Sequence, residues 1–106
     1  MTAEAINEII AERTLTRLAR NGNRKQVVVR LGKPQPSSLA EDYYCPVQIV
    51  GLGTTKVSKI IGLDAFQSLQ RALKYISFRL QHSREKSGLI LYCWEQGDDM
   101  GFPEVP

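Results

Sequence analysis

The segment WEQGDDMGFP gathers acidic side chains near the end of a chain that is otherwise basic. The carboxylates in and just beyond it are Glu95, Asp98, Asp99 and Glu104. Carboxylates can bind calcium or serve as an acid–base pair, but a calcium loop needs about six oxygen ligands at alternating positions, and that spacing is absent. The glycines favour turns, and Phe102 is suited to fold back over the end of the core. We therefore predict a turn with an apolar latch and no metal site.

The other reactive side chains are His82, Cys45 and Cys93. Together they could ligate zinc or form a cysteine–histidine nucleophile, but no Cys-x-x-Cys spacing supports a metal site. His82 falls near the end of a predicted helix, where the helix dipole favours an imidazolium whatever the function. Both cysteines lie in apolar, strand-like runs, so we expect buried free thiols, with a disulfide as the alternative. We expect no catalytic residues and no cofactor.

The glycine-rich run GLGTT, residues 51–55, invites comparison with a phosphate-binding loop. Such a loop leads from a strand into a helix whose N-terminus points at the anion, and it ends in Gly-Lys-Ser/Thr. Here a β-branched run follows, and that ending is missing. The run therefore predicts a hairpin turn.

Composition narrows the function classes further. A chain of 106 residues fits one domain and can bury a core without disulfides or metals. The net charge of +3 is mild, and the clustered Lys/Arg run that marks many nucleic-acid-binding proteins is absent. There is no secretion-signal pattern and no apolar run of membrane-spanning length. We expect a single domain over residues 1–106, located in the cytoplasm and away from membranes.

Four strands are predicted in the N-terminal part, over residues 8–20, 25–31, 43–50 and 54–61. The first alternates poorly, so its buried face stays open, and a helical start around residues 3–11 is the alternative. Asn21-Gly22 favours a type I′ hairpin turn. Residues 1–7 look frayed, and residues 32–42 form a long loop, mobile or in contact with a partner.

Alternation assigns a buried face to the second and third strands. The side chains predicted to share such faces are Val27, Val29 and Leu31 in the second, and Tyr43, Cys45, Val47 and Ile49 in the third. Pro46 removes a backbone donor, so the third strand needs an edge or a bulge there.

One helix follows, capped by Asp64 with Gln67 as capping-box partner. Its predicted apolar stripe consists of Phe66, Leu69, Leu73, Ile76 and Leu80, with Ala65 and Ala72 at the margin. The basic run SREKSG ends it. Residues 89–94 are almost wholly apolar, which suits a central strand, and residues 95–106 form a turn and tail. The fold class is therefore α+β: two layers, with a mainly antiparallel sheet of four N-terminal strands and one C-terminal strand, and one amphipathic helix.

The side of this helix opposite the stripe carries an aromatic residue. At about 100° per residue, Phe78 lies nearly opposite the stripe. Its predicted neighbours on this candidate interface are Gln67, Arg71, Lys74 and Tyr75. Aromatic and arginine side chains anchor protein interfaces, although a single exposed Phe is also tolerated.

The order of short motifs resembles a known family. The motifs are AERTLT, RLGKP, YYCPVQIVGLG, GLDAFQSLQRALKYI and GDDMGFP, from Ala11 to Pro103. Together they resemble a family of small bacterial single-domain proteins described only as a domain of unknown function. The resemblance implies that GDDMGFP belongs to the domain, and it carries no activity or site residues.

The sequence as a whole predicts a non-enzymatic module that binds a protein partner or a second copy of itself as a homodimer. Weak binding of nucleic acid to the basic helix face is the alternative. A small hydrolase using cysteine or carboxylates ranks third.

Overall fold

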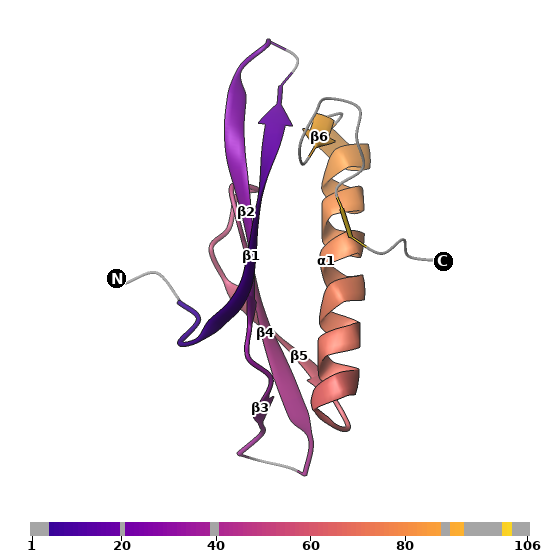
Figure 1. Cartoon of the computed structure of the whole chain (residues 1–106). Coiled ribbons are helices and arrows are strands. Elements are labelled where there is room, and N and C mark those ends of the chain that lie inside the picture. Colours follow the sequence, from indigo (N-terminus) through magenta and orange to yellow (C-terminus); the bar gives the residue numbers. More distant parts are fainter. Residues whose placement is uncertain (1–4, 20, 39–40, 88–89, 93–100, 103–106) are drawn as a thin grey trace.

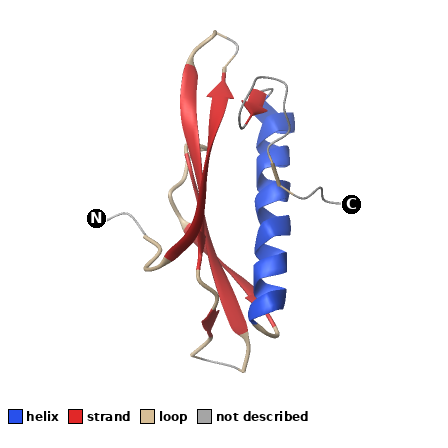
Figure 2. Cartoon of the chain, in the orientation of Figure 1, coloured by secondary structure: helices blue, strands red, loops and turns tan. Residues whose placement is uncertain are grey.

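A computed structural model of the chain describes residues 5–19, 21–38, 41–87, 90–92 and 101–102, and the fold is stated for these. The elements are β1 (Ile9–Leu18), β2 (Arg24–Gly32), β3 (Gln35–Pro36), β4 (Tyr43–Val50), β5 (Val57–Gly62), α1 (Ala65–Ser87) and β6 (Ile90–Tyr92). The long helix lies along one face of the sheet, and no helix of the described residues covers the other face (Figures 1 and 2). The protein is a two-layer α+β fold, as predicted.

Every strand pairing in the described part of the sheet is antiparallel, in the order β6-β1-β2-β4-β5. Tyr43 and Tyr44 of β4 pair with β3 on one edge and with β5 on the other, so β3 continues the line of β2. β3 also lies inside the predicted loop over residues 32–42. The prediction that the last strand is central is wrong, because the three described residues of β6 pair with β1 alone at the edge of the sheet.

The first strand buries the face that carries Leu15. Leu15 pairs with Val27 of β2, and both side chains are fully buried. The predicted alternative of a helical start is wrong for residues 5–11, which run irregularly and then enter β1.

A hairpin joins β1 to β2 at the predicted place, but its turn type differs. The Ala19 amide donates to the Asn23 carbonyl, and the Gly22 amide to the Ala19 carbonyl, which leaves a loop of three residues. Gly22 has a φ of 86°, whereas Asn21 has no positive φ. A type I′ turn requires positive φ at both central residues, so that prediction is wrong. The longer loop needs only the glycine in the left-handed region.

Pro46 lies where the ladder beside β4 becomes irregular. Leu31 pairs with Val47 and Gln35 with Tyr44, so four steps along β2 and β3 face three steps along β4. One extra residue is a bulge, and the predicted irregularity at Pro46 is confirmed.

The core forms between the helix-facing side of the sheet and α1. Its buried apolar side chains are Leu15, Val27, Val29, Leu31, Cys45, Val47, Ile49, Ala72, Ile76 and Leu80. The assignment of the buried strand faces is confirmed for these positions. The assignment of Phe66 to the buried stripe is wrong: its side chain is 78% exposed, and Ala72, predicted at the margin, is fully buried.

Close approach at the start of the helix explains this rotation. A Cβ on Gly62, the last residue of β5, would lie 2.7 Å from the Cα of Ser68 in α1, so the backbones leave no room for a side chain. Ser68 is fully buried there, and Ala72 lies one turn further on. Because small residues must face the sheet at this end, the bulky Phe66 is turned to solvent.

The helix begins as predicted. The Gln67 amide donates to the Asp64 carboxylate at 2.7 Å, and the Gln67 side-chain oxygen accepts from the Leu63 amide at 2.8 Å. The side chain thus reaches one residue beyond the cap itself. The helix ends at Ser87, within the basic run predicted to stop it.

The helix phase can be tested by alanine substitution. Ile76→Ala should lower the free energy of unfolding by about 2–5 kcal/mol, because it empties a buried position. Phe66→Ala should change it by less than about 0.5 kcal/mol, because the ring is exposed. Denaturant unfolding followed by circular dichroism measures both, and equal losses would contradict the observed phase.

Candidate functional site

The outer face of α1 carries the predicted interface residue Phe78. Its side chain is 57% exposed, and its ring stacks on that of His82, with centroids 6.1 Å apart and planes 14° from parallel. His82 is also exposed. The two rings form a continuous aromatic surface over one turn of the helix, so Phe78 does not stand alone.

Two other predicted interface residues stabilise the start of the helix. Gln67 is half-buried and caps the helix through Leu63. Arg71 is exposed and donates from Nη1 to the Ile61 carbonyl of β5 at 3.2 Å. Arg71 therefore holds the helix against the sheet edge while its guanidinium stays open to solvent.

Lys74 and Tyr75, the remaining predicted members, point in different directions. Lys74 is exposed beside Phe78. Tyr75 is half-buried and packs against the core, and its hydroxyl lies 3.0 Å from the Ser58 hydroxyl. The structure therefore brings Arg71, Lys74 and Phe78 together on the outer face and places Tyr75 on the flank towards β5.

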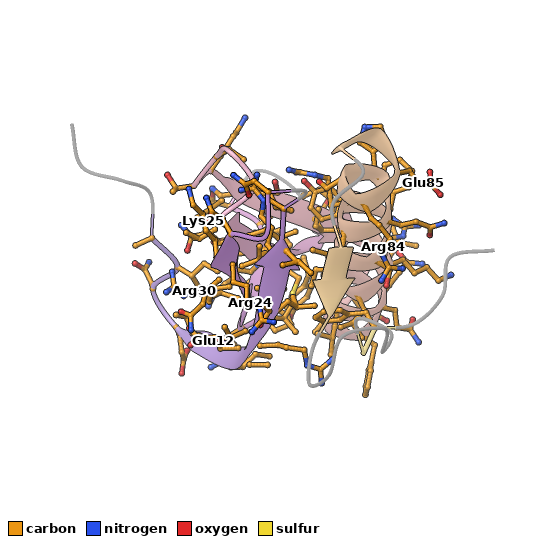
Figure 3. The ribbon with its side chains drawn as sticks, turned by 90° about the horizontal axis from the view of Figure 1, so that it is seen from above. Glu12, Arg24, Lys25, Arg30, Arg84 and Glu85 are labelled. Atoms are coloured by element: carbon orange, nitrogen blue, oxygen red, sulfur yellow. The ribbon has the colours of Figure 1, made fainter. Side chains whose placement is uncertain are left out.

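Glu85 was not among the predicted interface residues. It is exposed, lies seven residues beyond Phe78, as Arg71 lies seven residues before it, and its carboxylate accepts from the Gln81 amide at 3.2 Å. Since seven residues make about two helical turns, the three side chains follow one line along α1. Figure 3 shows Glu85 on the side of the helix away from the sheet. We call Arg71, Lys74, Phe78 and Glu85 the outer helix face.

A groove of about 510 Å³ lies on the opposite side of the sheet, which the helix does not cover. Its walls include Ile6, Glu8, Lys33, Tyr44, Pro46 and Lys59. The Lys59 ammonium lies 5.0 Å from the centre of the Tyr44 ring, and Lys33 lies 3.8 Å from the Glu8 carboxylate. Sequence reasoning missed this groove because residues 1–7 looked frayed, whereas residues 5–7 form one wall.

The same uncovered face holds an ion pair between neighbouring strands. Arg30 of β2 donates from Nε to the Glu12 carboxylate of β1 at 2.8 Å. Figure 3 shows both side chains on the side of the sheet away from α1. Their mutual pairing leaves this part of the face with little net charge.

The predicted apolar latch is present. Phe102 is half-buried and packs against the core, with the Arg13 guanidinium carbon 4.8 Å from its ring centre. Arg13 also donates to the Gly101 carbonyl, and Gly101 has a φ of 76°. The carboxylates Glu95, Asp98, Asp99 and Glu104 lie outside the described residues.

Cys45 is a free, buried thiol, so it forms no disulfide with Cys93, which lies outside the described residues. Burial raises the pKa of the Cys45 thiol to about 11. Its sulfur donates weakly to the Gly32 carbonyl at 3.4 Å. A thiol that stays protonated at neutral pH is a poor nucleophile.

Two kinds of feature are absent from the described residues. No three His, Cys, Asp or Glu side chains among these residues come together as metal ligands. Within the same part of the chain, α1 is not apolar enough to cross a membrane.

The described residues define a small α+β domain whose surface includes an exposed helix face and a groove. By sequence, the chain belongs to the family described as Domain of unknown function (DUF6968), which matches residues 11–104. No curated protein and no solved structure matches the chain. The match extends over GDDMGFP, as the resemblance implied.

The buried thiol gives a test of the core. In a Cys93→Ser background, where Cys45 is the sole thiol, native protein should react with a thiol reagent far more slowly than unfolded protein at neutral pH. Because the folded pKa lies above the ordinary value of 9.0, this group's contribution to stability is full below pH 9.0 and falls as the pH approaches about 11. A Cys45→Ala variant should lose stability less steeply over that range. Equal reactivity of native and unfolded protein would contradict the burial.

Proposed function

We propose that this domain is a non-enzymatic, self-associating module, and that its partner is a second copy bound through the outer helix face. The observation that carries the proposal is the position of Phe78, midway between Arg71 and Glu85 on one line of the helix. An exposed aromatic flanked at equal spacing by opposite charges is complementary to its own copy.

A two-fold axis near Phe78 would bring the opposite charges of the two copies together. In an antiparallel pair of helices, the residue seven positions before Phe78 faces the residue seven positions after it on the partner. Arg71 would therefore meet the partner's Glu85, about 10.5 Å from the axis at 1.5 Å per residue, and the same contact would recur on the other side. Lys74 likewise would face the partner's His82.

The expected dimer is weak. Fully burying an exposed Phe side chain contributes about 1.5–3 kcal/mol, and Phe78, which is 57% exposed, can gain a little over half of that on each chain. Exposed ion pairs add about 0–1 kcal/mol each. Association also costs translational and rotational freedom. A small interface of this kind fits a dissociation constant of about tens of micromolar.

Sedimentation velocity over a concentration series tests the proposal. Wild-type protein should shift from monomer to dimer, whereas Phe78→Glu should stay monomeric because it places two carboxylates at the axis. Phe66→Glu is the matched control, since Phe66 is an exposed aromatic on the same helix away from the line. A wild-type monomer at all concentrations, or equal loss in the control, would refute the dimer.

Charge reversal tests the register of the pair. Arg71→Glu and Glu85→Arg should each weaken the dimer, because each sets like charges against one another. The double variant Arg71→Glu/Glu85→Arg should recover most of the affinity. If the double variant were as weak as the sum of the single ones, the antiparallel arrangement would be wrong.

A further inference from the structure

Three polar side chains, those of Ser58, Tyr75 and Arg79, meet on the flank of α1 that faces β5. Arg79 donates from Nη1 to the Tyr75 hydroxyl at 2.7 Å, and the Ser58 hydroxyl lies 3.0 Å from the same oxygen. The Arg79 guanidinium carbon also lies 5.7 Å from the centre of the Tyr75 ring. Lys56 stands two residues before Ser58, and its charge acts on the Tyr75 hydroxyl. We call these four residues the Tyr75 cluster.

Among the residues that the structure describes, the two cations of the cluster have no acidic partner. Within the described residues, no carboxylate forms an ion pair with Arg79 or Lys56. Glu85, the acidic residue of α1, lies on the outer helix face. A local excess of positive charge next to two hydroxyl groups attracts an anion.

Arg79 is not required merely to satisfy the tyrosine hydroxyl. The Ser58 hydroxyl already pairs with Tyr75, and a hydroxyl can both donate and accept. Arg79 uses one of its five N–H donors in this contact, and the others can donate hydrogen bonds to a ligand. Arg79 is half-buried, so its side chain loses less freedom on binding than an extended surface arginine would.

The pKa of the Tyr75 hydroxyl responds to the same positive charges. Burial tends to raise the pKa of the Tyr75 hydroxyl, but the bonds from Ser58 and Arg79 and the charges of Arg79 and Lys56 outweigh burial. The net result is a pKa below the ordinary tyrosine value. A negative charge is therefore stabilised at this point of the surface.

We infer that the Tyr75 cluster binds the phosphate group of a small molecule through Arg79, Lys56 and the hydroxyls of Ser58 and Tyr75. Arginine offers paired donors to phosphate oxygens, and lysine adds a compact charge. Two cations match a phosphate dianion better than a carboxylate, which carries one charge. The site lies on the β5 flank, so it does not depend on dimerisation through the outer helix face.

Nuclear magnetic resonance titration with inorganic phosphate at constant ionic strength tests this site. Amide signals of Ser58, Tyr75 and Arg79 should shift together and saturate, and acetate should bind several-fold more weakly. Shifts scattered over the chain, or acetate binding as tightly as phosphate, would overturn the phosphate assignment.

Three variants locate the binding groups. Arg79→Gln should weaken phosphate binding about tenfold or more, since it removes charge-assisted hydrogen bonds, and Lys56→Gln should weaken it less. Arg79→Lys should restore part of the affinity by returning the charge. Lys25→Gln, an equal charge change on the β1–β2 hairpin, should bind as wild type. Unchanged affinity in a folded Arg79→Gln protein, or an equal loss in Lys25→Gln, would overturn the site.

Discussion

The contact between the end of β5 and the first turn of α1 determines how the helix packs on the sheet. Gly62 leaves no space for a Cβ against the backbone of Ser68, so the helix meets the sheet there through small residues. That contact sets the rotation of the whole helix. Once Ser68 and Ala72 face inward, Ile76 and Leu80 follow at one-turn spacing, and the opposite line of the helix carries Phe78 into solvent. The buried layer and the exposed face are thus two results of one close approach.

Much of the fold was predictable because local patterns agree with it. Alternation found the buried faces of β2 and β4, and the cap at Asp64 placed the helix start. The orientation of the first helical turn was not predictable, because a count of apolar residues favours Phe66 over Ser68, although the rest of the predicted stripe faces the core. The distance between Gly62 and Ser68 depends on how β5 packs against the helix, and the pattern of a short sequence segment does not show this packing. The edge position of β6 was not predicted either, because an almost wholly apolar segment is compatible with a central or an edge strand.

The candidate surfaces also differ in whether the sequence could predict them. Helical geometry alone was enough to predict that Phe78 is exposed, since its angle to Ile76 and Leu80 follows from the periodicity. The partners of Tyr75 required the tertiary structure, because Ser58 lies on a different element. The groove required it too, because residues 5–7 gain their order from contacts with distant strands: the Lys33 amide donates to the Glu8 carbonyl, and Ile6 packs near Gly32.

The Arg71 contact with Ile61 has a further effect at the margin of the sheet. In the described part of the chain β5 pairs with β4 alone, so its other edge presents backbone groups of the kind that recruit foreign strands. Arg71 donates a hydrogen bond to the Ile61 carbonyl, and Lys59 adds a positive charge to the same strand. An edge protected in this way resists uncontrolled strand addition and aggregation. Contacts between copies by strand addition are therefore disfavoured at this margin of the sheet.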